Sequence, residues 1–344
     1  LAKFSMVSNQ IYWAVKTERG VGFGARAPNS GNAVRIPVDN PPQVENANTS
    51  PRRCFVSISI DKMTRKVQTG KGASSFVDTL QMIMDDGEES ALFHGNRMLH
   101  MDGSGVIATV NGAYSGTTPV LSHPYNYSFG ATQYIEDQGA WVTFLSSDGT
   151  VVRGVRRITG ISWANQTVTL HNAINGLQDN DLIVYGDDLG NSYNNEWQGF
   201  RYFMVNTGTV HGLSTTTNRR WAAQVVDDTA APIPYSAEFP FRVYSAVAYR
   251  AGFEPKNFCV VMHPAMYKAH TDTYEGDIRY RASEQSFLRA YEKPAIEILG
   301  QPMEVYSTPY CPFQEIIGIY KPDLEKGEVQ DWDWDEDGGG ILKQ

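Results

Sequence analysis

The chain has 344 residues, enough for one large core or for two to three smaller ones. Apolar residues make up 41% and charged residues 19%, a composition that excludes a disordered chain. The net charge of −9 argues against sequence-specific nucleic-acid binding, which requires clustered Lys and Arg. No stretch approaches the roughly 18 apolar residues of a membrane span, so no membrane partner is expected. The three cysteines, with no CxxC pair, predict neither a disulfide framework nor a zinc site.

Charge is distributed unevenly along the chain. Residues 11–75 hold ten basic and four acidic side chains, a balance of +6 that leaves −15 for the remainder. A basic arm on an acidic body is typical of a segment that docks on a neighbouring molecule. The alternative interpretation is a solvated basic face.

The N-terminal region alternates between apolar and polar residues in several places. This pattern predicts strands at 11–15, 33–38 and 54–60, whereas the polar, proline-containing stretch 40–51 predicts a loop. Strands joined by a long polar link form an extended hairpin. Its apolar content is too low for a core of its own, so we expect the hairpin to lie on another part of the protein.

From residue 75 the apolar spacing becomes helical. Ser75 and Asp78 fit a capping box, and four apolar residues then share one helical face: Phe76, Leu80, Ile83 and Met84. Gly87 interrupts the pattern, which resumes and ends at the glycines of residues 102–105. The predicted helix has about 25 residues, or ~37 Å at 1.5 Å per residue, a length that suggests a spine.

The middle of the chain has the short alternating runs of a small antiparallel barrel or sandwich, bounded by polar loops as an insertion would be. The predicted strands are Thr132–Glu136, Ala140–Leu145, Thr150–Ile158, Thr167–His171 and Asp181–Tyr185. The pattern after residue 240 is mixed. It predicts helices at 241–251 and 264–270 and strands at 258–262, 302–306 and 316–320.

No catalytic, cofactor or metal site is predicted. The run Gly20-Val-Gly22-Phe-Gly-Ala25 matches the loose dinucleotide fingerprint, but Pro28 prevents the helix that must follow it. His94 and His100 are interpreted as surface or packing residues. The acidic C-terminus resembles the start of a calcium loop, with Gln344 at the position that requires Glu. Paired carboxylates in a sugar cleft are a further alternative, although no spacing identifies such a pair.

Several segments together resemble the major capsid proteins of tailed bacteriophages with the Hong Kong 97-type fold. The segments are Ser75-Phe-Val-Asp-Thr-Leu80, Glu88-Glu-Ser-Ala-Leu92, Asn96-Arg-Met-Leu99, Asp102-Gly-Ser-Gly-Val-Ile-Ala-Thr-Val110, Phe253-Glu-Pro255, Phe258-Cys-Val-Val-Met-His-Pro264, Ile278-Arg-Tyr280, and Ile316–Tyr320 followed by Pro322-Asp323. The order of the expected elements agrees with this family. The resemblance covers nearly the whole chain except 115–205.

The resemblance implies an α+β fold with an N-terminal arm, an extended β-hairpin loop, a long spine helix, peripheral and axial domains, and a small all-β insertion. The implied divisions are the N-terminal arm at 1–10, the extended loop at 11–72, the spine helix and start of the peripheral domain at 73–114, the β-rich insertion at 115–205, the return to the peripheral domain at 206–230, the axial domain at 231–315, and the closing strand with the acidic C-terminus at 316–344.

The function that the resemblance implies is self-assembly into hexamers and pentamers of an icosahedral head around double-stranded DNA. We therefore expect no enzyme activity and no cofactor. The expected location is the virion, assembled in the host cytoplasm. The expected partner is the chain itself, with scaffolding, portal and decoration proteins as further candidates and packaged DNA near it without specific binding.

Under this hypothesis the working residues are subunit contacts. The candidates are basic residues of the arm and acidic residues of the C-terminus: Arg19, Arg26, Arg35, Arg52, Arg53, Asp331, Asp333, Asp335 and Asp337. Two alternatives stay open. One is a virion decoration, tail or other β-rich ligand-binding module, and the other is a hydrolase that uses carboxylates.

Overall fold

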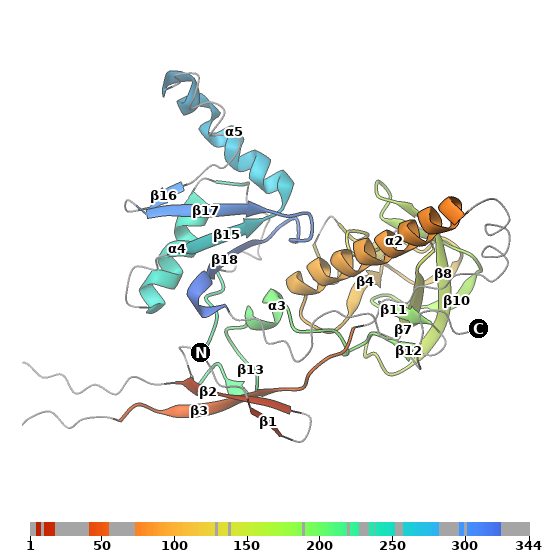
Figure 1. The fold of residues 1–344 in the computed structure, drawn as a ribbon, viewed down its shortest axis with the longest axis horizontal. Coiled ribbons are helices and arrows are strands. Elements are labelled where there is room, and N and C mark those ends of the chain that lie inside the picture. Colours follow the sequence, from red (N-terminus) through yellow and green to blue (C-terminus); the bar gives the residue numbers. More distant parts are fainter. Residues whose placement is uncertain are drawn as a thin grey trace, which may run out of the picture.

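The computed structural model describes residues 5–7, 10–17, 41–54, 73–127, 130–136, 139–187, 190–218, 221–226, 234–236, 238–251, 257–281, 296–298 and 301–324. This part of the chain has a mixed α+β fold in which strands predominate. Figure 1 shows three regions: a long hairpin, a barrel beside a long helix, and a separate sheet with two helices.

The hairpin region is an antiparallel sheet of three strands in the order β1-β2-β3. The strands are β1 (Ser5–Val7), β2 (Gln10–Lys16) and β3 (Val44–Thr49). β2 and β3 pair from Ile11 opposite Thr49 to Lys16 opposite Val44. Strand β3 lies inside the stretch 40–51 that was predicted to be a loop, so that prediction was wrong. Its sequence is polar, and pairing with β2 overrides the weak strand propensity of its Glu and Asn residues. The strand predicted at 33–38 and residues 55–60 lie outside the described residues.

Helix α2 (Ala73–His100) is the longest element and runs for 28 residues. It begins two residues before Ser75, whose side chain lies outside the described part of the structure together with that of Asp78, and it passes through Gly87 without the predicted interruption. A glycine inside a helix costs only about 1 kcal/mol relative to alanine, and Gly87 is buried, where its small size permits close packing. The C-terminal end falls just before Asp102, as expected.

A closed antiparallel barrel follows α2. Its sheet runs in the order β6-β4-β11-β7-β8-β9, with β12 on β11, while β5 and β10 form a separate pair. The strands are β4 (Val106–Val110), β5 (Tyr114–Gly116), β6 (Leu121–Ser122), β7 (Trp141–Leu145), β8 (Val152–Ser162), β9 (Thr167–Leu170), β10 (Ile174–Leu177), β11 (Leu182–Asp187) and β12 (Gly190–Asn191). The barrel closes where the Leu121 N–H donates to the Gln166 carbonyl at 2.8 Å and the Leu170 N–H donates to the Thr117 carbonyl at 2.8 Å. Figure 1 shows α2 running along one side of it.

The barrel encloses the main apolar core. Sixteen buried residues cluster there: Met101, Ile107, Ala108, Val110, Leu121, Ala131, Tyr134, Ile135, Val142, Phe144, Ile158, Val168, Leu170, Ile174, Leu177 and Ile183. The predicted strands at 140–145, 150–158, 167–171 and 181–185 correspond to β7, β8, β9 and β11. The segment 132–136 is instead a turn in which Gln133 N–H donates to the Gly130 carbonyl, so its apolar residues indicated burial and not a strand. β4 lies before residue 115, where the β-rich insertion was predicted to begin, so the sheet of the barrel extends across the start of the predicted insertion.

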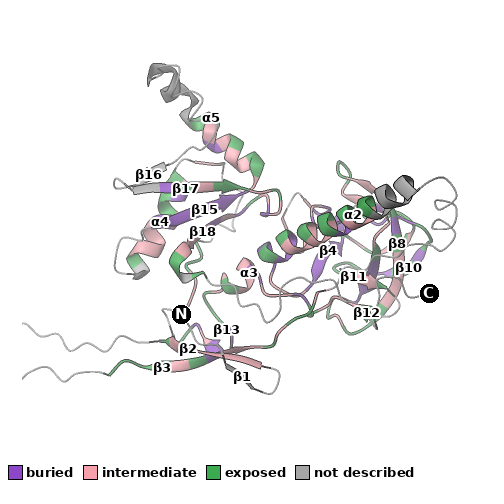
Figure 2. Ribbon diagram, viewed as in Figure 1, coloured by how far each residue is buried: buried purple, intermediate pink, exposed green. Residues whose placement is uncertain are grey.

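The third region is a four-stranded sheet in the order β16-β17-β15-β18. Its strands are β16 (Ile296–Ile298), β17 (Gln301–Ser307), β15 (Phe258–Met262) and β18 (Ile316–Tyr320), and its helices are α4 (Glu238–Ala251) and α5 (Pro264–Arg281). All five residues of β15 are buried, which accounts for its wholly apolar sequence (Figure 2). Helix α5 extends beyond the predicted end at residue 270.

A short connector links the barrel to the other two regions. It contains α3 (Phe200–Phe203), β13 (Thr209–Val210) and β14 (Leu213–Ser214), and β13 and β14 pair as a small hairpin. Figure 1 shows this connector between the long hairpin below it and the sheet above it. The connector is therefore the segment at which the three described regions meet.

Candidate functional site

Two of the nine predicted contact residues lie in the described part of the chain. Arg52 and Arg53 are both exposed, and neither forms an ion pair with a described residue. The other seven lie outside the described residues: Arg19, Arg26, Arg35, Asp331, Asp333, Asp335 and Asp337.

The two arginines occupy a fixed place at the base of the hairpin. Immediately before them, the Thr49 hydroxyl donates to Gln198 Oε1 at 3.0 Å. Immediately after them, Cys54 Sγ lies 3.7 Å from Met98 Sδ on α2. Burial raises the pKa of the Cys54 thiol, and the nearby Glu196 carboxylate raises it further, so the thiol stays protonated and packs as a small apolar group. The chain thus presents two cations beside the C-terminal end of α2.

The hairpin base is held by the turn between β13 and β14. This two-residue turn consists of His211 and Gly212, both with positive φ, as the twist of a tight hairpin requires. The Asn48 N–H of β3 donates to the His211 carbonyl at 2.9 Å. Asn218 Nδ2 donates to Glu45 Oε2 on β3 at 3.1 Å. The hairpin is therefore tied to the connector at several points along β3.

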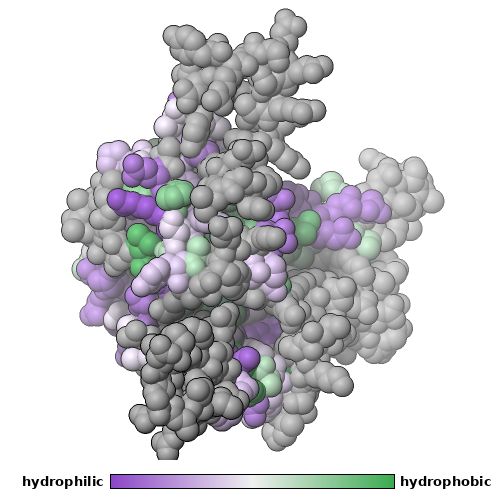
Figure 3. All heavy atoms as spheres, turned by 90° about the vertical axis from the view of Figure 1, so that its left-hand side faces the viewer, coloured by the Kyte–Doolittle hydropathy of each residue, from purple (hydrophilic) through white to green (hydrophobic). Residues whose placement is uncertain are grey.

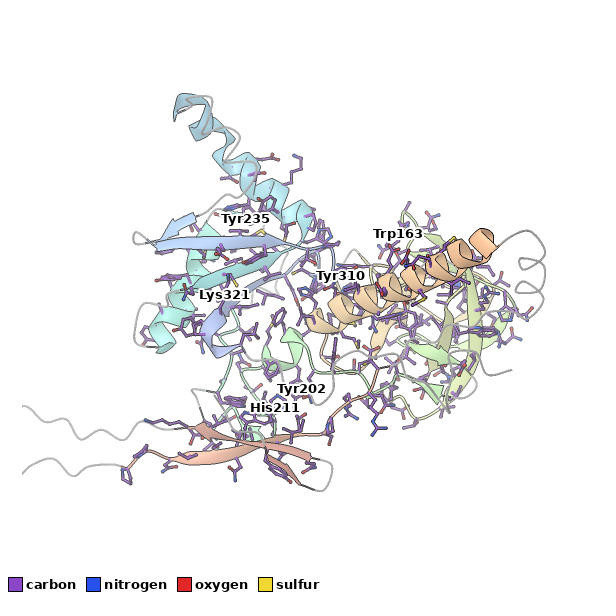
Figure 4. All side chains as sticks on the ribbon, in the orientation of Figure 1. Trp163, Tyr202, His211, Tyr235, Tyr310 and Lys321 are labelled. Atoms are coloured by element: carbon purple, nitrogen blue, oxygen red, sulfur yellow. The ribbon has the colours of Figure 1, made fainter. Side chains whose placement is uncertain are left out.

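Aromatic rings surround the imidazole of His211. Its centroid lies 4.9 Å from the Trp13 ring on β2, 5.1 Å from Tyr202 and 5.1 Å from Phe203 on α3. Figure 4 shows Tyr202 and His211 next to each other above the hairpin. Burial lowers the pKa of His211 to about 4, while a backbone hydrogen bond involving Asn48 acts in the opposite direction. The imidazole is thus neutral at pH 7.

Beneath the hairpin base, a buried ion pair joins α2 to the segment after the barrel. Arg97 Nη2 donates to Glu196 Oε1 at 2.5 Å, and the two residues are 1% and 5% exposed. The Arg97 guanidinium also lies 5.2 Å from the Tyr185 ring centroid. Burial opposes the charge on Arg97, but the Glu196 carboxylate outweighs it and the pKa of Arg97 is raised. The pair fixes α2 against the barrel exit.

The outer face of α2 carries four exposed carboxylates that the sequence interpretation did not single out. We call them the acidic stripe: Asp85, Asp86, Glu88 and Glu89. Within the described ranges none of the four forms an ion pair, and exposed Met82 and Leu92 flank them. Figure 2 shows this face of α2 as largely exposed. Four acids within five residues were the signal that could have identified it.

A second polar cluster joins the barrel to the four-stranded sheet. Arg201 of α3 pairs with Glu315, which also accepts from the Tyr127 hydroxyl. Gln133 Nε2 donates to the Cys311 carbonyl at 2.9 Å, and the Tyr310 ring lies 5.6 Å from Phe93 of α2. Tyr310 is labelled in Figure 4 between the two regions. Loop 308–315 thus docks on the barrel, on α2 and on α3.

Buried His123 belongs to the same junction. Its ring packs 5.0 Å from Tyr127 and 5.4 Å from Tyr134. Burial lowers the pKa of His123 to about 3, and the cation of Arg201 lowers it further. The junction therefore holds one fixed cation and a neutral imidazole at pH 7.

The described residues contain no group of three His, Cys, Asp or Glu side chains placed to hold a metal ion. None of the described helices is long and apolar enough to cross a bilayer. On the face shown in Figure 3, the hydrophobic residues among those coloured are scattered between hydrophilic ones. Comparisons with protein-family models, with curated proteins and with solved structures find no match to this chain.

Proposed function

We propose that this chain is a shell-forming subunit of the kind found in tailed-bacteriophage heads. The observation that carries the proposal is the long hairpin, which has almost no core of its own. Ala47 is the one fully buried apolar residue in the described parts of β2 and β3, and the described contacts between the hairpin and the connector are mostly polar ones along β3. An isolated two-stranded hairpin is marginal in water, so an arm of this kind gains its stability by lying on a neighbour.

The order of the elements supports the same proposal. A basic hairpin precedes a long helix, a barrel follows, and a sheet with two helices ends the described chain. This is the order expected for capsid proteins of the Hong Kong 97 type with an insertion after the spine helix. The proposed partner is another copy of the chain, arranged in hexamers and pentamers.

Charge complementarity suggests which described surfaces meet. Arg52 and Arg53 are exposed cations at the hairpin base, and the acidic stripe on α2 is an exposed set of anions. In the proposed contact, the basic hairpin segment of one copy lies against the acidic stripe of the next copy. The acidic C-terminus at Asp331–Asp337 is the competing surface for the same cations. Such contacts act mainly on the rate and register of association, and salt weakens them.

The proposal is tested by electron microscopy of the purified chain after sedimentation. We expect closed polyhedral particles or flat hexameric sheets, with the yield falling as the salt concentration rises. A monodisperse monomer at high concentration, with no scaffold or partner protein able to assemble it, would contradict the proposal. Ligand binding by the barrel would then become the leading alternative.

A further inference from the structure

We propose that the His211–Gly212 turn is an acid-sensitive latch, in which charging the His211 imidazole releases the turn from β3 and removes one of the ties that hold the hairpin. The proposal concerns a single subunit and does not depend on shell formation. Its basis is the position of one buried imidazole at the point where the hairpin meets the connector.

The turn is the contact between the connector and the backbone of β3. The His211 carbonyl accepts the Asn48 N–H, and the His211 N–H donates to the Tyr202 hydroxyl at 3.1 Å, so the turn bridges β3 and α3. Gly212 approaches β3 so closely that a Cβ there would lie 3.0 Å from Asn48 Nδ2. The opposite side of the turn is fixed by the Trp221 indole N–H, which donates to the Val210 carbonyl at 3.0 Å. Any displacement of the turn therefore breaks its hydrogen bond to β3.

The imidazole is buried where a charge has no compensation. His211 is 6% exposed, and its Nδ1 atom has no hydrogen-bond partner among the described residues. A buried polar nitrogen without a partner already costs free energy, and a buried cation without a counterion costs much more. The closed latch therefore requires the neutral imidazole.

The groups that face the ring come from three elements. β2 contributes the Trp13 ring, α3 contributes Tyr202 and Phe203, and β3 contributes the backbone of Asn48. None of these groups is a carboxylate, and the Asn48 backbone hydrogen bond, which favours the imidazolium, is outweighed by burial.

Two ionised groups on the neighbouring elements β3 and α3 have partners of their own. The Glu45 carboxylate accepts from Asn218 Nδ2, and the Arg201 guanidinium pairs with Glu315 and lies 3.7 Å from the Tyr125 ring centroid. Protonation of His211 would therefore create a charge that the closed arrangement does not neutralise. Release of the turn exposes the ring to water and removes that cost.

The sign and size of the effect follow from the pKa. The pKa is about 4 in the closed latch and 6.5 for a solvated histidine, so the open form binds the proton more tightly. Above pH 6.5 the ratio of closed to open forms is highest, and this ratio decreases as the pH falls toward 4. The ratio of closed to open forms should fall about 20-fold between pH 7 and pH 5, and about 300-fold at most.

Amide hydrogen exchange of the full chain tests the latch, with rates corrected for their intrinsic pH dependence. The reporter of β3 protection is the Asn48 amide, which donates to the His211 carbonyl, and the reference is β4 in the barrel. We expect protection of the Asn48 amide to fall about 20-fold from pH 7 to pH 5 and to stay below that of β4, which follows unfolding of the whole chain. His211→Phe keeps a ring that cannot be charged, so its β3 protection should not depend on pH.

Two further variants keep the test decisive. His211→Asn tolerates the positive φ and carries no charge, so its β3 protection should also be independent of pH, whatever its absolute value. His171→Phe removes an exposed histidine of the barrel and should behave like the unmodified chain. The latch is refuted if β3 protection in the unmodified chain does not change with pH. It is equally refuted if the Asn48 amide is as well protected as β4 at every pH, which would mean that it exchanges only when the whole chain unfolds, or if His211→Phe and His211→Asn follow the unmodified chain.

Discussion

Arg97 of α2 and Glu196 of the segment after the barrel form an ion pair from which water is almost wholly excluded. The contact at 2.5 Å is accompanied by a hydrogen bond from Arg97 Nη1 to Met101 Sδ at 3.1 Å. Arg97 Nε and Glu196 Oε2 have no partner among the described groups. The pair thus fixes α2 relative to the segment after the barrel. Removing the two charged groups from water costs free energy, and their mutual attraction offsets that cost.

The first prediction concerns this pair. Arg97→Met or Glu196→Gln alone should lower the free energy of unfolding by about 3 to 5 kcal/mol, because each leaves the partner buried without a counterion. The double variant should cost less than the sum of the two single variants. Urea unfolding followed by circular dichroism measures all three. Lys268→Met, which removes an exposed pair with Asp272, is the control and should change stability by less than about 1 kcal/mol. Additive costs at Arg97 and Glu196 would show that the two residues act independently.

The second prediction is acid destabilisation through buried histidines. Burial lowers the pKa of His100 to about 4, of His123 to about 3 and of His211 to about 4. Because these values lie below 6.5, the unfolded chain binds more protons, and the free energy of unfolding falls as the pH drops below 6.5. Each histidine contributes up to about 1.4 kcal/mol per pH unit until its folded pKa is reached.

Urea unfolding between pH 7.5 and pH 5 checks this slope. His123→Phe should make the dependence on pH shallower by the contribution of one histidine, whereas His171→Phe should leave it unchanged. Equal slopes for His123→Phe and the unmodified chain would mean that His123 is already solvated or paired in the folded state.

The third prediction is a charge exchange between copies. Arg52→Glu with Arg53→Glu should leave a folded subunit that no longer assembles, as judged by circular dichroism and by sedimentation with electron microscopy. Adding Glu88→Lys and Glu89→Lys should restore particles if the acidic stripe is the partner. Adding Asp331→Lys and Asp333→Lys should restore them if the C-terminus is the partner.

A control variant separates specific pairing from overall charge. Arg242→Glu changes an exposed arginine on α4 and should assemble normally. If the arginine reversals at 52 and 53 assemble like the unmodified chain, electrostatic docking of the hairpin base is wrong. If neither compensating exchange restores particles, the cations face a different surface.

The fourth prediction concerns the close approach of the connector to α2. A Cβ on Gly199 would lie 2.1 Å from the Met98 carbonyl oxygen and 2.5 Å from that of Leu99. Gly199→Ala should therefore displace the connector from the end of α2 and lower the melting temperature by several degrees, an expected cost of about 1 to 3 kcal/mol. Gly190→Ala is a matched control because a Cβ there meets nothing within 4 Å. Similar melting temperatures for both variants would show that the contact yields easily.

Several elements were predictable because their sequence pattern matches their environment. The wholly apolar run of β15 and the apolar residues of β7 and β9 each report burial directly. Strand β3 was missed because its polar residues carry no such pattern and only pairing with β2 makes them a strand. Segment 132–136 was misassigned because its apolar residues, which pack in the barrel core from a turn, have the same sequence pattern as the buried residues of a strand.

The candidate site was predictable only in part. The excess of cations in the hairpin is visible in the sequence, and so is the acidic run of α2. The latch is different, because nothing local marks His211 as buried. Its environment comes from Trp13, Tyr202 and Asn48, which the fold brings together from distant parts of the chain.

The barrel begins and ends at neighbouring positions. Val106 on its first strand lies directly opposite Val184 on β11, and the Asn194 N–H donates to the Ser104 carbonyl at 2.8 Å. A pulling force applied between α2 and the connector would therefore pass across this short seam and leave the other strands without load. The barrel is mechanically a side branch, so a change of its size or outer surface need not alter how tension is carried from the helix to the rest of the molecule.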